Sequence, residues 1–142
     1  MNEPPKNSIR IEKFTDIIEK VEVIGMALIM DRSCYVWLSL ASSPKVIGSL
    51  VTSISTKYEA MPLCTTILEG QSHDDAYANG LARRLSKRYN IQCFISSNIP
   101  ESFEEGLMQI EQRVKIIFDK YFRHPAIMMA SETAEESIIC HT

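Results

Sequence analysis

Several features that place proteins in particular functional classes are missing from this sequence. The five glycines are too widely spaced to form a phosphate-binding loop, and none of the three histidines has a Cys or His partner at the spacing of metal ligands. The longest apolar run, Val23 to Met30, is far shorter than the ~20 residues that a membrane-spanning helix needs. These absences argue against a nucleotide-binding motif, a zinc site and a membrane span.

An excess of positive charge is also lacking. The 142 residues carry a formal net charge of −3, whereas a domain that holds nucleic acid is usually basic. The cysteines Cys34, Cys64, Cys93 and Cys140 are scattered, and the first residues lack the apolar core of a secretory signal. We therefore expect reduced thiols, no nucleic-acid or membrane partner, and a cytoplasmic location with the nucleus as a second compartment.

The residues that are present indicate one globular domain. Hydrophobic residues make up 45% of the chain and charged residues 23%, in a length that suits a single core. β-Branched and aromatic residues predict strands in the first half, separated by short polar turns. The expected strands are 9–12, 17–30, 34–40, 46–55 and 63–68.

Two helices are expected in the second half, with a further strand at 91–96 between them. The first helix begins near Ser72 or Asp74, which can cap it, and ends at Asn90, which tolerates a left-handed conformation. The second begins at Ser102, and its apolar residues are spaced in steps of four and three, which aligns them along one side. They are Phe103, Leu107, Ile110, Val114, Ile117 and Tyr121.

Strands that precede the helices and are joined by short turns predict an α+β fold. We expect an antiparallel β-sheet of about six strands with two helices. The domain is expected to span residues 9–123, between a flexible N-terminal segment 1–8 and a flexible C-terminal tail 124–142 that shows little hydrophobic pattern.

Few residues suggest catalysis. His73 precedes Asp74 and Asp75 and could form a metal site with them, but acids at the start of a helix more often stabilise its dipole. Cys64 could act as a nucleophile, but the sequence shows no base that would activate it. We assign no catalytic, metal-binding or cofactor-binding residue. A small cysteine- or metal-dependent hydrolase stays as the lesser alternative.

Two groups of residues are candidates for protein contacts. Basic residues gather near the end of the first expected helix, where they suit the helix dipole, a solvated face, a protein partner or, with least support, nucleic acid. They are Arg83, Arg84, Lys87 and Arg88. Phe118 and Phe122 widen the apolar surface of the second helix, so they either complete a thick core or face another subunit. These six residues are our candidate partner-binding residues.

A dispersed pattern of residues extends over most of the expected domain. A strand containing Trp37 is followed by a turn at Pro44. The next stretch holds Lys57-Tyr58-Glu59, Met61-Pro62-Leu63, Thr65 and Leu68. The last holds Gly80-Leu81-Ala82-Arg83-Arg84-Leu85-Ser86-Lys87-Arg88, Asn90, Gln92, Phe94, Ser96 and Asn98. From about Phe14 to Phe122, this pattern resembles the proteasome assembly chaperone 4 family.

The resemblance implies a non-catalytic protein that pairs with a proteasome assembly chaperone 3-like subunit. It further implies that the heterodimer holds 20S proteasome α subunits while the seven-membered α-ring forms, and is then released. The loop 69–78 and the residues after Arg123 have no counterpart in the resemblance. The main alternative is an adaptor subunit of another intracellular complex, because a fold does not fix a function.

Overall fold

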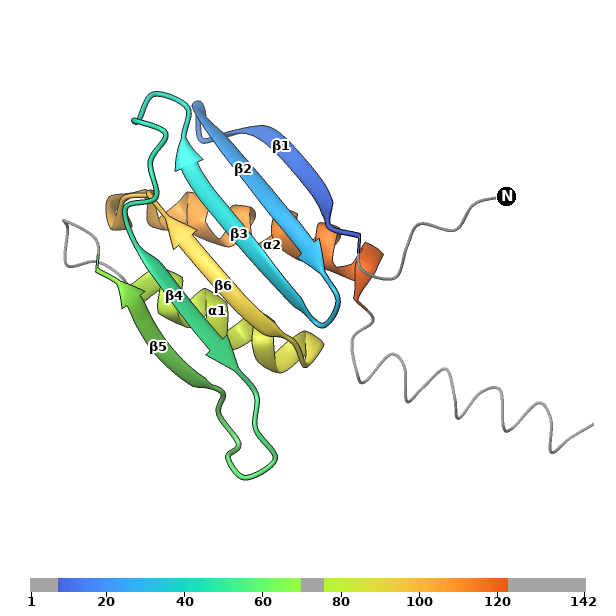
Figure 1. Ribbon diagram of the computed structural model, residues 1–142. Helices are drawn as coiled ribbons and strands as arrows, with labels where there is room; N and C mark the ends of the chain where they lie inside the picture. Colours follow the sequence, from blue (N-terminus) through green and yellow to red (C-terminus); the bar gives the residue numbers. More distant parts are fainter. Residues whose placement is uncertain (1–7, 70–75, 123–142) are drawn as a thin grey trace, which may run out of the picture.

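The computed structural model describes residues 8–69 and 76–122, which form one mixed sheet and two α-helices (Figure 1). The expected caps Ser72 and Asp74, and the expected C-terminal tail, lie outside the described residues. The elements in chain order are β1 (Arg10–Ile18), β2 (Val21–Met30), β3 (Ser33–Leu40), β4 (Leu50–Ile54), β5 (Leu63–Leu68), α1 (Ala76–Tyr89), β6 (Gln92–Ser97), the 3-10 turn η1 (Glu101–Phe103) and α2 (Glu104–Tyr121).

The six strands lie in the order β1-β2-β3-β6-β4-β5. Four neighbouring pairs are antiparallel, and the central pair β3–β6 is parallel. The α+β class with about six strands and two helices is thus confirmed, but the sheet is mixed rather than wholly antiparallel. The parallel pair arises because the chain crosses behind the sheet through α1 before β6 inserts between β3 and β4 (Figure 1).

The first hairpin differs from the sequence prediction, which extended one strand from 17 to 30. The chain turns at Glu19 and Lys20, whose φ angles are 52° and 67°, and this tight turn separates β1 from β2. Two successive residues with positive φ are the signature of a hairpin turn that usually holds Asn or Gly. Neither residue type occurs here, so the turn gave no signal in the sequence.

Both helices follow the predicted apolar spacing but differ at their ends. Asn90, directly after α1, has a φ of 54°, which confirms the predicted left-handed end. The expected capping role of Ser102 is wrong, because Ser102 lies within η1 and α2 starts at Glu104. The Phe103 N–H donates to the Pro100 carbonyl at 3.0 Å, and this bond closes the 3-10 turn that precedes the helix.

The core lies between the two helices and one face of the sheet. Phe118 of α2 is fully buried there and packs edge-on against the rings of Tyr89 and Phe122, with centroid distances of 5.3 and 5.5 Å. The Tyr89 hydroxyl donates to an Asp119 carboxylate oxygen at 2.6 Å and so links α1 to α2. These contacts fix both helices on the same side of the sheet.

Charged contacts join α2 to the edge strand β1. The Tyr121 hydroxyl and the Lys120 ammonium both bind the Glu12 carboxylate, and these contacts lower the pKa of Glu12. The Arg113 guanidinium lies 3.2 Å from an Asp16 carboxylate oxygen. The helical layer therefore extends to one edge of the sheet and leaves the opposite face of the sheet uncovered.

Candidate functional site

The sheet has one face that neither helix covers, and we call it the open face (Figure 1). Strand residues point alternately to the two sides, so residues that alternate with the buried core residues lie on the open face. In β2 and β3 the core residues include Val23, Val36 and Leu38. The large apolar residues of the open face on the four central strands are Ile24, Met26, Leu28, Met30, Tyr35, Trp37, Leu50, Ile54 and Phe94. Its polar residues on these strands are Glu22, Ser33, Ser39, Thr52, Gln92 and Ser96.

The register of the strands brings the large side chains of the open face together. Tyr35 is paired with both Leu28 and Phe94, and Trp37 is paired with Met26. Directly opposed residues on one face of a sheet lie close enough for their side chains to touch. The centre of the open face is therefore a continuous surface of aromatic, aliphatic and thioether groups.

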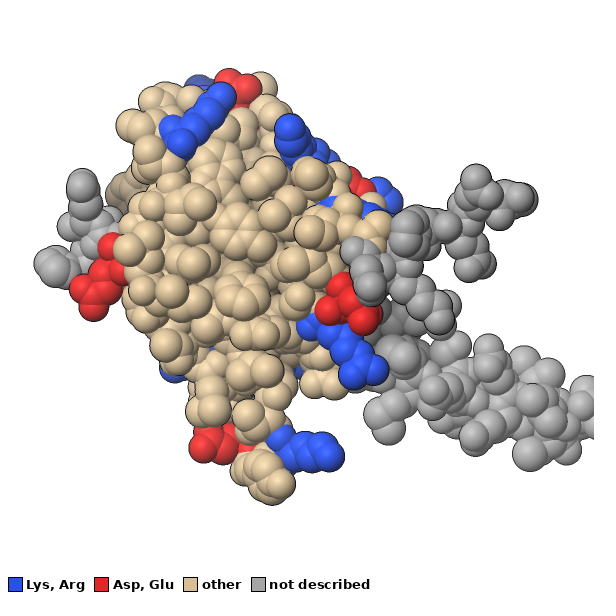
Figure 2. Space-filling model, viewed as in Figure 1, with Lys and Arg blue, Asp and Glu red and all other residues tan. Residues whose placement is uncertain are grey.

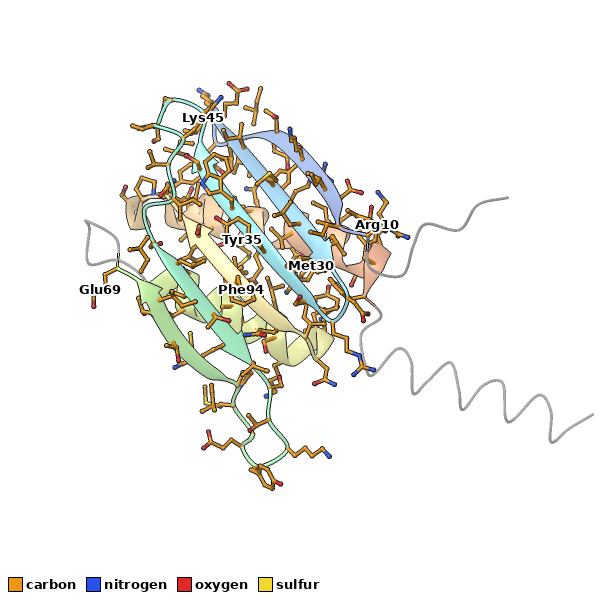
Figure 3. The ribbon with its side chains drawn as sticks, viewed as in Figure 1. Arg10, Met30, Tyr35, Lys45, Glu69 and Phe94 are labelled. Atoms are coloured by element: carbon orange, nitrogen blue, oxygen red, sulfur yellow. The ribbon has the colours of Figure 1, made fainter. Side chains whose placement is uncertain are left out.

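Charge is confined to the margin of this face. Strands β3, β4, β5 and β6 contain no Asp, Glu, Lys or Arg. Figure 2 shows a broad uncharged area over the middle of the sheet, with charged side chains at its periphery. In Figure 3, Tyr35 and Phe94 lie over the middle, whereas Arg10, Lys45 and Glu69 lie near the rim.

Much of this apolar surface is accessible to water. Ile11 in β1 is 59% exposed, and the cross-strand neighbours Ile54 and Leu63 are 46% and 49% exposed. Large contiguous apolar patches are uncommon on proteins that work alone and are typical of protein interfaces. The open face is therefore the candidate functional site of the described chain, and its chemistry is that of a protein-binding surface.

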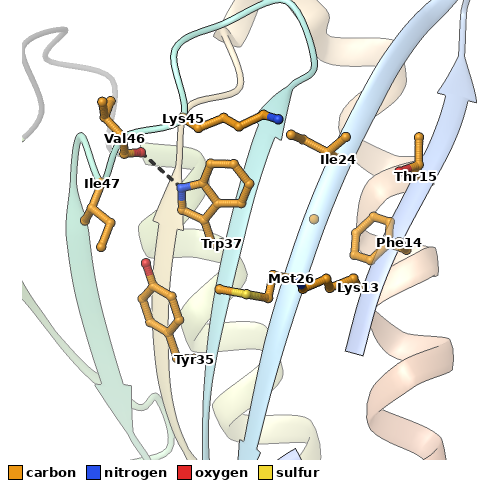
Figure 4. Close-up of a pocket in the computed structure, with 11 residues that line it drawn as sticks. Lys13, Phe14, Thr15, Ile24, Met26, Tyr35, Trp37, Lys45, Val46 and Ile47 are labelled. Atoms are coloured by element: carbon orange, nitrogen blue, oxygen red, sulfur yellow. Dashed lines mark hydrogen bonds between the residues drawn. The ribbon is translucent and has the colours of Figure 1, made fainter. Parts of the chain in front are cut away.

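The open face contains a hollow of about 480 Å³ beside Trp37 (Figure 4). Ile24, Met26 and Trp37 line it from the sheet, and the loop at Lys45 and Val46 forms one side. The indole N–H of Trp37 donates to the Val46 carbonyl at 3.0 Å, which fixes the loop against the strand. This bond satisfies the polar group of the indole and leaves its ring available for apolar contact.

The predicted basic residues lie on α1 but have different surroundings. Arg84 binds Glu111 of α2 at 2.6 Å, so it already has a partner within the chain. Arg83 lies beside the Cys64 thiol, and the Arg88 guanidinium lies over the Tyr89 ring. The exposed Lys87 forms no ion pair with any residue in the described ranges. The four residues thus do not act as one free basic patch.

The two phenylalanines predicted to bind a partner differ in how deeply they are buried. Phe118 is 0% exposed, which corrects its assignment as a partner-binding residue, because nothing outside the chain can reach its ring. Phe122 is partly buried and packs against the same core. The exposed apolar residues of α2 are instead Met108 and Ile116. Periodicity could not separate these roles, because the apolar surface of α2 is wide enough to pack on both the sheet and α1.

The cysteines provide no activated nucleophile among the described residues. Cys34 and Cys93 are buried neighbours across the β3–β6 pair, with sulfur atoms 3.7 Å apart, and burial raises the pKa of Cys34. Burial also raises the pKa of Cys64, whose Sγ donates to the Asn79 side-chain oxygen at 3.2 Å. A thiol with a raised pKa stays protonated at neutral pH and is a poor nucleophile.

The described ranges contain neither a metal-binding cluster nor a helix that could span a membrane. No group of three or more His, Cys, Asp or Glu side chains in those ranges is arranged to hold a metal ion. No helix there is both long and apolar enough to cross a bilayer. The predicted candidate His73 lies outside the described residues.

More than half of this chain matches a known protein family. The family model for proteasome assembly chaperone 4 matches residues 22–99, which run from β2 through β6. Human proteasome assembly chaperone 4 is 28% identical over 83 residues, and the mouse protein is 26% identical over the same length. These alignments cover 58% of this chain and 63% of each relative, so the chain matches less than two thirds of the relatives' length.

Comparison with solved structures supports the fold. One chain from the crystal structure of a chaperone complex for yeast 20S proteasome assembly aligns with a TM-score of 0.61 and 11% sequence identity. The alignment covers 78% of this chain and 96% of that chain. At this level of identity the likeness shows a shared fold for nearly the whole of the yeast chain.

Proposed function

The chain belongs to the proteasome assembly chaperone 4 family, and from this premise we propose that it is a non-catalytic chaperone of 20S proteasome assembly. In this proposal it pairs with a chaperone-3-type partner through the open face. The pair holds 20S α subunits while the α-ring forms and is released as assembly proceeds. The protein acts in the cytoplasm and in the nucleus.

The observation that carries the proposal is the apolar, uncharged centre of the open face. Water in contact with this much apolar surface costs free energy, and a second protein layer would remove that cost. Two sheets can pack face to face at a separation of ~10 Å with their inner side chains interleaved. A partner with an apolar sheet face of its own therefore fits the open face best.

The residue types on the open face suit recognition. Trp37, Tyr35 and Phe94 provide large rigid contact areas, and Met26 provides an adaptable one. Aromatic residues and methionine are enriched in the cores of protein interfaces, where a few of them carry most of the binding energy. Pairing through this face would place those residues at the centre of the interface.

The outer side of α1 would remain accessible in such a pair. Arg83 and Lys87 are exposed there, on the helical layer opposite the open face (Figure 1). Charged contacts at a water-exposed surface speed association and contribute little binding energy. A weak contact of this kind suits a client that must later be released. We assign this side of α1 to the 20S α subunits.

The direct test is affinity purification of the tagged full-length chain from its own cells, with the bound proteins identified by mass spectrometry. We expect a small chaperone-3-type protein and 20S α subunits, with few mature β subunits. Recovery of neither would overturn the assembly role and would favour an adaptor for another complex.

Two matched substitutions test whether the partner binds to the open face. Phe94→Asp places a charge at the centre of the open face and should reduce recovery of the partner at least tenfold. Met108→Asp makes the same kind of change on α2, where Met108 is 73% exposed, and should leave recovery unchanged. Circular dichroism must show that both variants are folded. Equal loss of the partner in both variants would exclude the open face as the pairing surface.

A further inference from the structure

We propose that the hollow beside Trp37 receives a bulky apolar side chain of the partner, accompanied by a carboxylate on the same strand or on the strand next to it. This inference rests on the proposed function, since it names the chemistry that the partner must bring to the open face. The hollow of about 480 Å³ falls in the range of ~300–1,000 Å³ that is typical of ligand pockets.

The shape of the hollow is fixed before any partner arrives. The Val46 carbonyl accepts hydrogen bonds from the Trp37 indole at 3.0 Å and from the Asn98 side-chain amide at 2.6 Å. These bonds tie the loop to β3 and to the end of β6. Interface anchors bind best in pockets that need little reorganisation, because ordering a loop costs free energy.

The backbone of Gly25 in β2 forms part of the floor of the hollow, and a side chain at this position would point to the covered face, because Gly25 alternates with the open-face residues Ile24 and Met26. Gly25 has no side chain, and a Cβ at this position would lie only 2.2 Å from the Phe14 ring. The Phe14 ring fills that space from β1, and Gly25 is paired with Phe14 in the register. The neighbours Ile24 and Met26 supply the apolar lining on the open side (Figure 4).

Two unpaired cations flank this apolar hollow. Lys13 and Lys45 are the charged members of its lining, and no acidic residue lines it. Neither lysine forms an ion pair with a residue in the described parts of the chain. Their positive charge would favour an acidic group on the partner and disfavour a basic one.

The geometry of a strand specifies how a partner could supply both groups. Residues two apart on a strand point to the same face, as do directly opposed residues of neighbouring strands. A large apolar residue with Asp or Glu at either of these positions would fill the hollow and approach Lys13 or Lys45. The structure therefore points to a partner sheet that carries this pair of residues.

The single tryptophan allows the hollow to be tested on the isolated chain, because Trp37 is the only source of indole fluorescence. The probes are 3-phenylpropionate, 3-phenylpropanol and 3-phenylpropylamine, which share an aromatic ring and differ in charge. We expect saturable changes in Trp37 fluorescence with roughly millimolar affinity for the carboxylate. The carboxylate should bind at least threefold more tightly than the alcohol, and the amine should bind most weakly.

The control is a Lys13→Gln/Lys45→Gln variant, which should bind all three probes with the same affinity. Absence of saturation, or equal affinities for the unmodified chain, would overturn the proposal.

A second arm tests the hollow with the co-purified partner. Thr15→Phe adds a ring at the rim of the hollow, and Thr65→Phe adds the same ring to the open face on β5, opposite Thr52. Both threonines are exposed, so both variants should fold. We expect Thr15→Phe to weaken partner binding at least tenfold more than Thr65→Phe.

The outcomes separate this inference from the proposed function. If the unmodified chain recovers no partner, the proposed function fails and the fragment titration alone decides whether the hollow binds an aromatic carboxylate. If the partner binds and the two phenylalanine variants weaken it equally, the pairing stands and the hollow is not its anchor.

Discussion

The two faces of the sheet are both apolar, yet they are built from different residues. The face under the helices is mainly aliphatic and almost completely buried, with Phe14 on the edge strand as its aromatic exception and Cys34 and Cys93 at its centre. Its aliphatic residues include Val23, Ala27, Val36, Leu38, Val51 and Ile95. The open face instead has Met26, Tyr35, Trp37 and Phe94 at its centre, and they remain partly accessible. Apolar content alone does not distinguish the faces, whereas residue type does.

The difference has a physical reason. β-Branched side chains have few rotamers, so they lose little freedom in a permanent core. Aromatic and thioether side chains tolerate water on one side and provide large contact areas when a second surface arrives. The covered face therefore has the composition of a core, and the open face has the composition of an interface.

The largest effect on folding stability, and so the strongest test of this comparison of the two faces, is expected at Phe118. Replacing this fully buried ring by alanine should destabilise the fold by about 3–5 kcal/mol, because it leaves a cavity between the helices. Urea unfolding of the isolated chain measures the loss. Phe122→Ala, at a partly buried position, should cost less. If Phe118→Ala kept full stability and lost only partner binding, the ring would belong to an interface after all.

Neighbouring residues of β3 offer the sharpest contrast between the faces. Val36→Ala should lower stability by about 2 kcal/mol, since Val36 is fully buried, and should leave the affinity of the folded chain for its partner unchanged. Tyr35→Ala should lower stability by less than about 1 kcal/mol, because it removes only cross-strand contacts. It should weaken partner binding by about 2 kcal/mol, or roughly 30-fold.

Denaturant unfolding and calorimetric titration with the purified partner would measure both quantities for the two β3 variants. The comparison of the faces would break down if Val36→Ala and Tyr35→Ala changed stability and binding in the same proportion.

A smaller effect should appear at alkaline pH on the covered side. Burial, together with the hydrogen bond donated to Asp119, raises the pKa of Tyr89 to about 12, whereas a tyrosine in an unfolded chain has a pKa of about 10. The folded chain therefore holds this proton more tightly than the unfolded chain. Its contribution to stability is complete below about pH 10 and is lost as the pH rises through about 12.

The variant Tyr89→Phe tests this linkage. It should lose about 0.5–1.5 kcal/mol at neutral pH, because the hydrogen bond that the Tyr89 hydroxyl donates to Asp119 is removed. Its stability should then fall less steeply between about pH 10 and 12 than that of the unmodified chain. Parallel unfolding curves over this range would show that Tyr89 does not carry the dependence.

The sequence predicted the elements better than their arrangement. Strand 63–68 is predicted by a short run of apolar and β-branched residues after Pro62, and the apolar side of α2 is predicted by its spacing in steps of four and three. The position of β6 between β3 and β4 was not predicted, since the order of strands depends on contacts between distant segments. The tight turn at Glu19 and Lys20 was missed because neither residue favours positive φ.

The open face was also missed, although the sequence contains a signal for it. In β3 the positions of Cys34 and Val36 are apolar, and so are the alternate positions of Tyr35 and Trp37. A strand that is apolar on both sides needs cover on both faces of its sheet. Two helices on one face leave the other face for a partner. The roles of Phe118 and Phe122 could not be separated in this way, because helical periodicity does not tell which neighbours cover a broad apolar side.

The smallest effect on stability is expected on the outer side of α1, where charge replaces apolar contact as the means of binding. Arg83→Ala/Lys87→Ala should change the free energy of unfolding by no more than ~0.5 kcal/mol, because both side chains are exposed. Association with the 20S α subunits should weaken several-fold at low salt and should depend less on salt than it does for the unmodified chain. Arg84→Ala is the control: it breaks the bond to Glu111, so it should cost up to about 1 kcal/mol of stability with a smaller effect on α-subunit binding. Surface plasmon resonance at several salt concentrations distinguishes the two. If the double variant showed the same salt dependence as the unmodified chain, the 20S α subunits would not bind at α1. The helical layer would then serve only to cover the core.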